Sequence, residues 1–212
     1  MIETSAPVLL APALVVPGDV VPPLNIRVAA PRRRSVAVLF ADICGFTRLV
    51  ESVEPEAVYR IMRPLLDDLV DCVHVQGGEI QQVLGDGFMA VFGLRDSYGD
   101  EVGRAFSAAC AMVRAGGADR PAVHIGVESG EVLVTESWEP AGFGVWGHAV
   151  NLAQRLCASA GPGEIMLGPA AFTGVGAAAT APAGAGPAAV ETLLRVRGIS
   201  DPVPAHRISA AA

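Results

Sequence analysis

Two aspartates stand where short apolar runs end, and their carboxylates are the groups best placed to do chemistry. Asp42 follows the apolar run Val36 to Phe40, and Asp86 lies between two glycines in a Gly-Asp-Gly sequence. A carboxylate at the end of a buried strand is costly unless something compensates its charge. If the two strands are neighbours, the carboxylates meet and repel unless they share a proton or a metal ion. For either aspartate alone, a turn or strand-end role is the better interpretation; together they favour a site for Mg²⁺ or Mn²⁺.

The segment after Asp42 can supply a partner for phosphate. Cys44-Gly45-Phe46-Thr47 predicts a tight turn with glycine at its centre. Backbone N–H groups in such a turn can face an anion, and the N-terminus of a following helix adds a partial positive charge. A divalent metal beside a phosphate-binding turn indicates nucleotide chemistry.

Asn151 and Arg155 form a third polar pair. They are four residues apart, so on a helix they share one face. An amide and a guanidinium beside an apolar stripe can simply be a solvated surface, and for this pair alone we prefer that interpretation. In company with the two aspartates and the glycine turn, the pair becomes a candidate for catalysis.

Three segments, FADICGFT, LGDGFMAVFG and FGVWGHAVNLAQR, resemble the catalytic domain of class III nucleotide cyclases in order and spacing. The resemblance runs from about Ser35 to Ile208. It implies closure of a nucleoside triphosphate to a 3′,5′-cyclic monophosphate, with pyrophosphate leaving. It also implies two metal ions, Mg²⁺ or Mn²⁺, held by Asp42 and Asp86 with help from the carbonyl of Ile43. The expected assembly is a head-to-tail homodimer with composite sites at its interface.

The resemblance also implies roles for the other candidate residues. From the second subunit, Asn151 would orient the ribose, and Arg155 would stabilise charge on the α-phosphate with a planar guanidinium that stays charged. Arg197 matches the position of a basic residue that binds the triphosphate. The turn that would contact the β- and γ-phosphates comprises Cys44, Gly45, Phe46 and Thr47.

Three positions depart from the family pattern. Gln82 stands where adenylate-forming members have a lysine, and Gly144 where they have an aspartate; with Leu84 they make the expected base pocket. Loss of buried base-reading partners predicts weak base selectivity, with ATP as the expected substrate and GTP or a pyrimidine triphosphate as rivals. His124 replaces a phosphate-binding arginine, and two roles stay open for it: a donor to phosphate, or a strand-end histidine without a ligand.

Two other classes of function are compatible with these residues. The departures at Gln82, Gly144 and His124 allow a catalytically silent homologue that binds nucleotides or a protein partner without turnover. The altered pocket also allows an enzyme of this fold that acts on a non-standard phosphate substrate. Retention of the metal and transition-state residues favours the active cyclase.

Charge and composition restrict the classes of binding partner and the cellular compartment that we expect. The 212 residues carry a formal net charge of −7, which argues against nucleic-acid binding through a general basic field. Arg32-Arg33-Arg34 is the only basic run and is interpreted as a solvated linker. Four widely spaced cysteines without a CxxC pair fit reduced thiols in the cytoplasm. The apolar N-terminal stretch is broken by prolines, is too short to span a membrane, and lacks the basic start of a signal peptide.

The remaining pattern predicts the elements that must position these groups. Helical spacing indicates a helix over Pro55 to Val75, and Asp100 would cap a second helix that ends at Arg114. Alternating strands and helices favour an α+β sandwich with a mixed, mainly antiparallel sheet covered by helices. The resemblance adds a ferredoxin-like, palm-type core.

The chain is thus expected to divide into an extended Pro-rich tail, residues 1–34, and one catalytic domain, residues 35–208. The shorter expected segments are strands at 122–127 and 131–135 joined by Ser129-Gly130, a strand at 164–167, a helical turn at 169–172, a flexible Ala/Gly loop at 173–190, and a final strand pair within 193–208.

Overall fold

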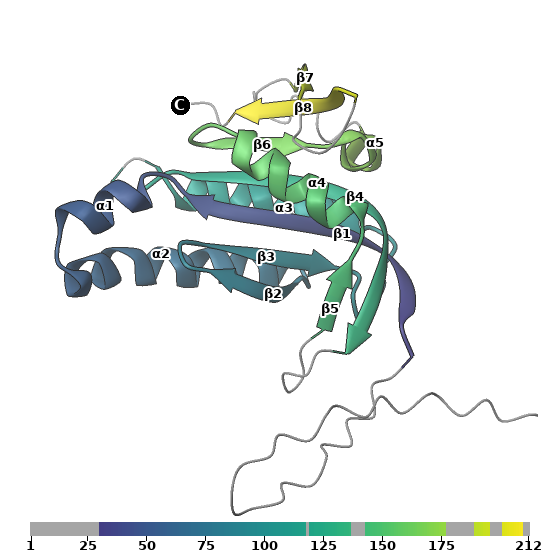
Figure 1. The fold of residues 1–212 in the computed structure, drawn as a ribbon, viewed down its shortest axis with the longest axis horizontal. Helices are drawn as coiled ribbons and strands as arrows, with labels where there is room; N and C mark the ends of the chain where they lie inside the picture. The colour runs from purple at the N-terminus through teal and green to yellow at the C-terminus, as the bar shows by residue number, and fades with distance from the viewer. Residues whose placement is uncertain (1–29, 118, 137–142, 177–188, 196–200, 210–212) are drawn as a thin grey trace, which may run out of the picture.

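The computed structural model describes residues 30–117, 119–136, 143–176, 189–195 and 201–209. They form one eight-stranded sheet with helices on both faces (Figure 1). The strands are β1 (Arg32–Ile43), β2 (Glu79–Leu84), β3 (Gly87–Phe92), β4 (Val123–Glu136), β5 (Phe143–Trp146), β6 (Glu164–Leu167), β7 (Val190–Leu194) and β8 (Val203–Ser209). The helices are α1 (Phe46–Ser52), α2 (Pro55–Val75), α3 (Glu101–Ala115), α4 (His148–Ser159) and α5 (Pro169–Val175).

The sheet is mixed and mainly antiparallel, which confirms the predicted α+β fold. Seven strands follow the order β2-β3-β1-β4-β6-β8-β7, and β5 pairs with β4 beside this path. The β4–β6 pair is parallel, and the other strand pairs are antiparallel.

Strand β1 lies between β3 and β4 and is buried on both faces. Leu39 and Ala41 face the larger core, whereas Val38 and Phe40 face the smaller one. A strand with two buried faces needs apolar residues at consecutive positions, which explains the unbroken apolar run before Asp42.

Helices α2 and α3 belong to the larger core, on one face of the sheet, and α4 packs on the opposite face. Figure 1 shows α4 in front of the sheet and α3 behind it. α2 spans the residues that its helical spacing predicted and buries Val58, Leu65 and Val73. Asp100 caps α3 as predicted, because its carboxylate accepts the N–H of Gly103 at 3.1 Å.

Strand β4 corrects the prediction of two strands joined at Ser129-Gly130. It is continuous from Val123 to Glu136, because Ser129 and Gly130 stay in register with Ala37 and Val36 of β1. The neighbouring strand holds the main chain extended where composition alone suggested a turn.

The segment ends also differ from the prediction. β1 begins at Arg32, and Arg33 forms an ion pair with Glu131 of β4, so the basic run belongs to the sheet rather than to a solvated linker. The rest of the expected tail, residues 1–29, and residues 177–188 of the expected loop lie outside the described residues. α5 continues to Val175, and β7 with β8 forms the predicted final strand pair.

The far end of β4 pairs with β1 on one side and β5 on the other. We call this projection, residues 132–136 and 143–146, the arm; in Figure 1 it extends away from the helices. Among the helices that the structure describes, none is long and apolar enough to cross a membrane.

Candidate active site

The sheet register brings the two predicted metal aspartates together. Asp42 of β1 lies directly opposite Gly87 of β3, the residue after Asp86 in the β2–β3 turn. A Cβ atom on Gly87 would lie 2.5 Å from the carbonyl oxygen of Ala41 and 2.8 Å from Oδ1 of Asp42. Glycine at this position is therefore what permits the close approach of the two strands, and with it the pairing of the carboxylates.

The pKa values of the two carboxyl groups are shifted in opposite directions. A hydrogen bond from His124 holds the pKa of Asp42 below its ordinary value. Burial and the adjacent charge of Asp42 raise the pKa of Asp86. Two carboxylates that resist being ionised together are stabilised by a cation placed between them.

These ligands fit a hard divalent cation. Mg²⁺ is usually held by one or two carboxylates plus substrate phosphates and water, and Asp42 with Asp86 supplies that pair. In the part of the chain that the structure describes, no group of three or more His, Cys, Asp or Glu residues is arranged to hold a metal. Two carboxylates leave the other coordination positions of such an ion to main-chain oxygens, substrate and water.

His124 has a partner that the sequence did not reveal. It lies opposite Asp42 in the β1–β4 register, and its Nε2 is 3.1 Å from Oδ2 of that aspartate. Its Nδ1 is 3.1 Å from the carbonyl oxygen of Ala160, just after α4, and so donates there. The hydrogen bond to Asp42 raises the pKa of the imidazole. His124 is therefore a contact of the carboxylate of Asp42, and only the alignment of the two strands shows it.

The predicted phosphate turn is present, with one amide already used. Gly45 adopts φ +80°, which favours glycine, and α1 begins at the next residue. The N–H of Cys44 donates to the carbonyl of Ala122 at 2.8 Å, so it is not free for phosphate. The remaining candidates are the amides of Gly45, Phe46 and Thr47, since the first N–H groups of a helix lack intrahelical acceptors. Burial also raises the pKa of the Cys44 thiol, which stays neutral beside Asp42.

Asn151 and Arg155 lie on α4, as predicted, one turn apart on the same face. The opposite side of α4 packs Ala149 and Ala153 against the smaller core. Asn151 is exposed and Arg155 is half-buried, so both side chains are accessible for a contact outside the core.

The expected base pocket is divided between two hairpins. Gln82 and Leu84 are exposed on β2, and Gln82 pairs with Met89 of β3. Gly144 lies on β5 in the arm, opposite Thr135 of β4. The register therefore does not place Gln82 and Gly144 in one row of the sheet.

The space beside Gly144 is already filled. A Cβ atom at this position would lie 2.5 Å from Oγ1 of Thr135 and 2.8 Å from Nε1 of Trp146. The indole N–H of Trp146 donates to that hydroxyl at 3.3 Å. Sequence reasoning missed both residues; the available signal was an aromatic residue two positions from a glycine on one face of a strand.

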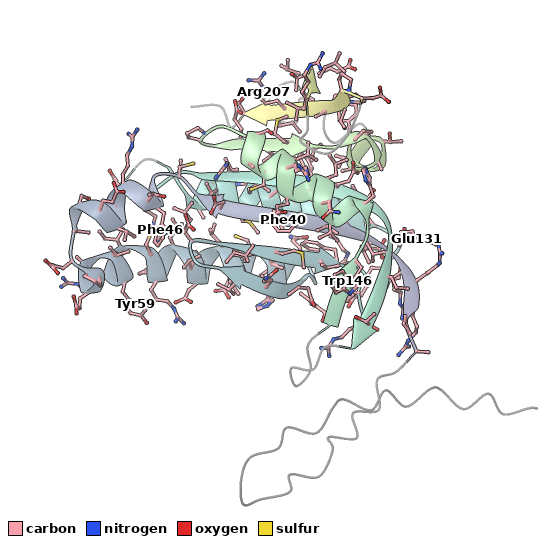
Figure 2. The ribbon with its side chains drawn as sticks, viewed as in Figure 1. Phe40, Phe46, Tyr59, Glu131, Trp146 and Arg207 are labelled. Carbon is pink, nitrogen blue, oxygen red and sulfur yellow. The ribbon has the colours of Figure 1, made fainter. Side chains whose placement is uncertain are left out.

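The two predicted metal aspartates, Asp42 and Asp86, which we call the metal end, lie far from the arm within one chain. Trp146 pairs with Leu133, which pairs with Arg33, whereas Asp42 lies 42 − 33 = 9 residues further along β1. Nine residues of strand span roughly 30 Å. Figure 2 shows Phe46, next to the phosphate turn, and Trp146 at opposite ends of the molecule. The remaining predicted site residue, Arg197, lies outside the described residues.

Comparison with known proteins agrees with this geometry. The sequence model described as the adenylate and guanylate cyclase catalytic domain matches residues 28–175. An adenylate cyclase of Streptomyces coelicolor is 30% identical over 141 residues, which cover 66% of this chain and 33% of that protein. An adenylate cyclase of Anabaena cylindrica is 35% identical over 68 residues, 32% of this chain and 14% of that protein. The crystal structure of the guanylyl cyclase Cya2 has a TM-score of 0.74 and 25% identity, and the match covers 85% of this chain and 94% of that chain. The chain thus spans a third or less of these two curated relatives.

Proposed function

Because the chain belongs to the adenylate and guanylate cyclase catalytic domain family, we propose that it is a class III nucleotide cyclase. It converts a nucleoside triphosphate to a 3′,5′-cyclic nucleotide and pyrophosphate. The observation that carries the proposal is the proximity of the Asp42 and Asp86 carboxyl groups, which the register of β1 with β3 brings together and which glycine at 87 permits.

Two divalent ions, Mg²⁺ or Mn²⁺, are the expected cofactors, and Asp42, Asp86 and the carbonyl of Ile43 would hold them. When bound, such ions lower the pKa of the attacking ribose hydroxyl and neutralise the leaving phosphates. The protein's own contribution begins with His124, which keeps the Asp42 carboxylate ionised and oriented. Amides at the start of α1 face the terminal phosphates, where Arg197 is expected to join them.

The active form is proposed to be a homodimer with sites shared between subunits. Asn151 would orient the ribose, and Arg155 would neutralise charge that develops on the α-phosphate, both from the second subunit. The separation of the arm from the metal end supports sharing, since a roughly 30 Å run of strand exceeds the reach of one nucleotide. In a head-to-tail pair, the arm of one subunit can approach the metal end of the other.

ATP is the expected substrate, with weak selectivity over GTP and pyrimidine triphosphates. Both named relatives above are adenylate cyclases, and Cya2 is a guanylyl cyclase, so relatedness alone does not select the base. Gln82, Leu84 and Gly144 are the proposed lining of the base pocket. All four cysteines are free thiols, which supports assignment to the reducing cytoplasm.

The test is a product assay with each of ATP, GTP, CTP and UTP in the presence of Mn²⁺. The purified protein is used at high concentration, so that a weak dimer forms, and cyclic products are separated chromatographically. A cyclic nucleotide from at least one substrate is expected. Absence of cyclic product from all four would contradict the proposed activity.

A silent homologue is the second candidate function, and the contact between His124 and Asp42 is the observation that favours it. In that case the histidine would occupy Asp42 permanently and keep the metals out. Nucleotides would then bind without turnover, and Mn²⁺ would not raise the melting temperature. A cyclase-fold enzyme for a non-standard phosphate substrate would instead show Mn²⁺ binding but no cyclic product from the four common nucleotides.

A further inference from the structure

We propose that Trp146 and Thr135 recognise the nucleobase in place of the missing aspartate at position 144. The indole stacks on the base, and the threonine hydroxyl meets the polar edge of the base. The inference rests on the proposed function, because it takes the arm as the base-binding part of the shared site.

The first argument is the occupancy of the space beside Gly144. Oγ1 of Thr135 and Nε1 of Trp146 lie only 2.5 Å and 2.8 Å from the place where the Cβ atom of any side chain at 144 would be. The glycine is therefore a place where other side chains converge, rather than a gap left for water. An aspartate could enter only if the indole and the hydroxyl moved away.

The second argument is that Trp146 is hydrogen-bonded to a neighbouring strand and yet exposed to solvent. Its N–H is tied to Thr135, yet the residue keeps 66% of its surface exposed. Leu133 lies opposite Trp146 on the same face and is also 39% exposed. An aromatic ring whose N–H is hydrogen-bonded to a neighbouring strand and which keeps two thirds of its surface exposed is suited to stack on a flat ligand.

The third argument is the chemistry of the polar group that remains. The aspartate of adenylate-forming members can only accept, so it favours a base that presents an amino group. The hydroxyl of Thr135 accepts the indole N–H with one lone pair, and keeps a proton to donate and a second lone pair to accept. It can serve the amino group of adenine or the carbonyl of guanine alike. The substrate class is therefore a nucleoside triphosphate whose base stacks on the indole, with little discrimination between an amino and a carbonyl group at the edge of the base.

Binding to Trp146 can be followed directly by tryptophan fluorescence. Trp138 is the only other tryptophan in the sequence, so Trp138→Phe leaves a single reporter. With Mn²⁺ present, the protein is titrated with 3′-deoxy-ATP and 3′-deoxy-GTP, which lack the attacking hydroxyl and cannot cyclise. Inorganic tripolyphosphate serves as the ligand without a base. Both nucleotides are expected to quench the fluorescence, with affinities within about tenfold of each other, and tripolyphosphate is expected to leave it unchanged.

Substitutions at Trp146 and Thr135 distinguish stacking of the base on the indole from the contact of the hydroxyl with the edge of the base. Trp146→Leu should weaken binding of both nucleotides by about five- to 150-fold, the range of aromatic–base stacking, measured by calorimetry. Trp146→Phe should recover most of that loss, because it keeps an aromatic face. Thr135→Val keeps the shape of the side chain but removes the hydroxyl. Compared with the parent protein, it should bind both nucleotides a few-fold more weakly. Tyr59→Leu on α2 is the matched control, since Tyr59 is 62% exposed and distant from the arm, and its affinities should equal the parent's.

Each contrary outcome has a distinct meaning. Unchanged nucleotide affinity in Trp146→Leu, or equal quenching by tripolyphosphate, overturns the stacking role. A Trp146→Leu protein that becomes monomeric in analytical ultracentrifugation, with Tyr59→Leu still dimeric, assigns the ring to the subunit interface and also overturns it. No nucleotide binding by the parent protein refutes the proposed function together with this inference. Binding with the expected losses but no cyclic product would refute the proposed activity alone and leave base recognition by Trp146 supported.

Discussion

The metal end and the arm each depend on a glycine that another residue crowds, but the crowding groups differ. At the metal end, the nearest atom to a Cβ on Gly87 would be the main-chain carbonyl of Ala41. At the arm, the nearest atoms to a Cβ on Gly144 would belong to the side chains of Thr135 and Trp146. Main chain in a central strand cannot move without breaking the sheet, whereas exposed side chains can rotate. The carboxylate pair is therefore rigidly specified, whereas the proposed base-recognition surface is open to change.

The largest expected effect follows from removing the Asp42 carboxylate at the metal end. Asp42→Ala should lower cyclase activity by more than about a hundredfold, beyond the loss typical for a residue that only supports a metal ligand. It should also abolish the rise in melting temperature that Mn²⁺ gives the parent protein, because that rise reports binding to the native state. Product formation and thermal unfolding with and without Mn²⁺ measure the two effects. Asp96→Ala, at an exposed carboxylate outside the site, should change neither.

The second prediction tests whether the two halves of the site meet across subunits. Asp86→Ala lacks the metal end, and Arg155→Ala lacks the α4 contribution, so each protein alone should be inactive. Random mixing makes half of the dimers heterodimers, each with one intact site, so about a quarter of the parent activity should return. Activity of the mixture is measured after heterodimers are verified with two affinity tags. Verified heterodimers without any activity would show that the sites are not shared in this way.

The third prediction compares the two glycines directly. Gly87→Ala forces a methyl group against main chain and should destabilise the protein by about 1–3 kcal/mol, the usual range for overpacking. Gly144→Ala meets only movable side chains and should cost less than about 1 kcal/mol. Urea unfolding of the two variants measures the difference, and a larger loss for Gly144→Ala would reverse the comparison.

The crowding beside Gly144 also affects which substitutions can change the preference between ATP and GTP. Adenylate-forming members of the family carry lysine and aspartate at the positions of Gln82 and Gly144, but an aspartate at 144 has to displace both Thr135 and Trp146. Gln82→Lys with Gly144→Asp should therefore shift the ATP/GTP ratio only modestly. Adding Trp146→Ala makes room for the aspartate and should increase the shift, as measured by kcat/KM for both nucleotides.

The smallest expected effect concerns Glu128, which lies on β4 between the two regions. Its side chain is buried and accepts the N–H groups of Ser129 at 2.7 Å and Ala171 at 2.9 Å. Burial raises the pKa of Glu128 above its ordinary value. The native state then holds this proton where the unfolded state has released it, so stability falls as pH rises from the unfolded pKa towards the folded pKa.

Comparison with Glu128→Gln isolates this term. The parent should lose stability relative to the variant as pH rises through that window, by at most about 1.4 kcal/mol per pH unit, the limit for one proton. Urea unfolding from pH 4 to pH 8 measures the trend. A difference between the two proteins that stays constant with pH would exclude the buried carboxyl as its source.

The sequence alone determined the elements whose signals are local. The two-sided apolar run of β1, the Gly-Asp-Gly turn and the helical spacing of α2 all depend on residues close together in the chain, and each was found where predicted. The motif order was also sufficient to indicate the family, and it placed Asn151 and Arg155 on one helix. The strand, the turn and the helix follow from backbone propensity and from the period of buried positions, whereas the family was indicated by the resemblance of the motifs.

Tertiary structure alone decided the features that depend on register between distant strands. His124 meets Asp42, 82 residues away in the chain, because β4 aligns with β1 at that one position. β4 stays unbroken at Ser129 because β1 pairs with it there. Trp146 fills the space beside Gly144 because the β4–β5 register puts both next to Thr135. A shift of one residue in either pairing would turn these side chains to the opposite face, so no property of the single residues determines the contacts.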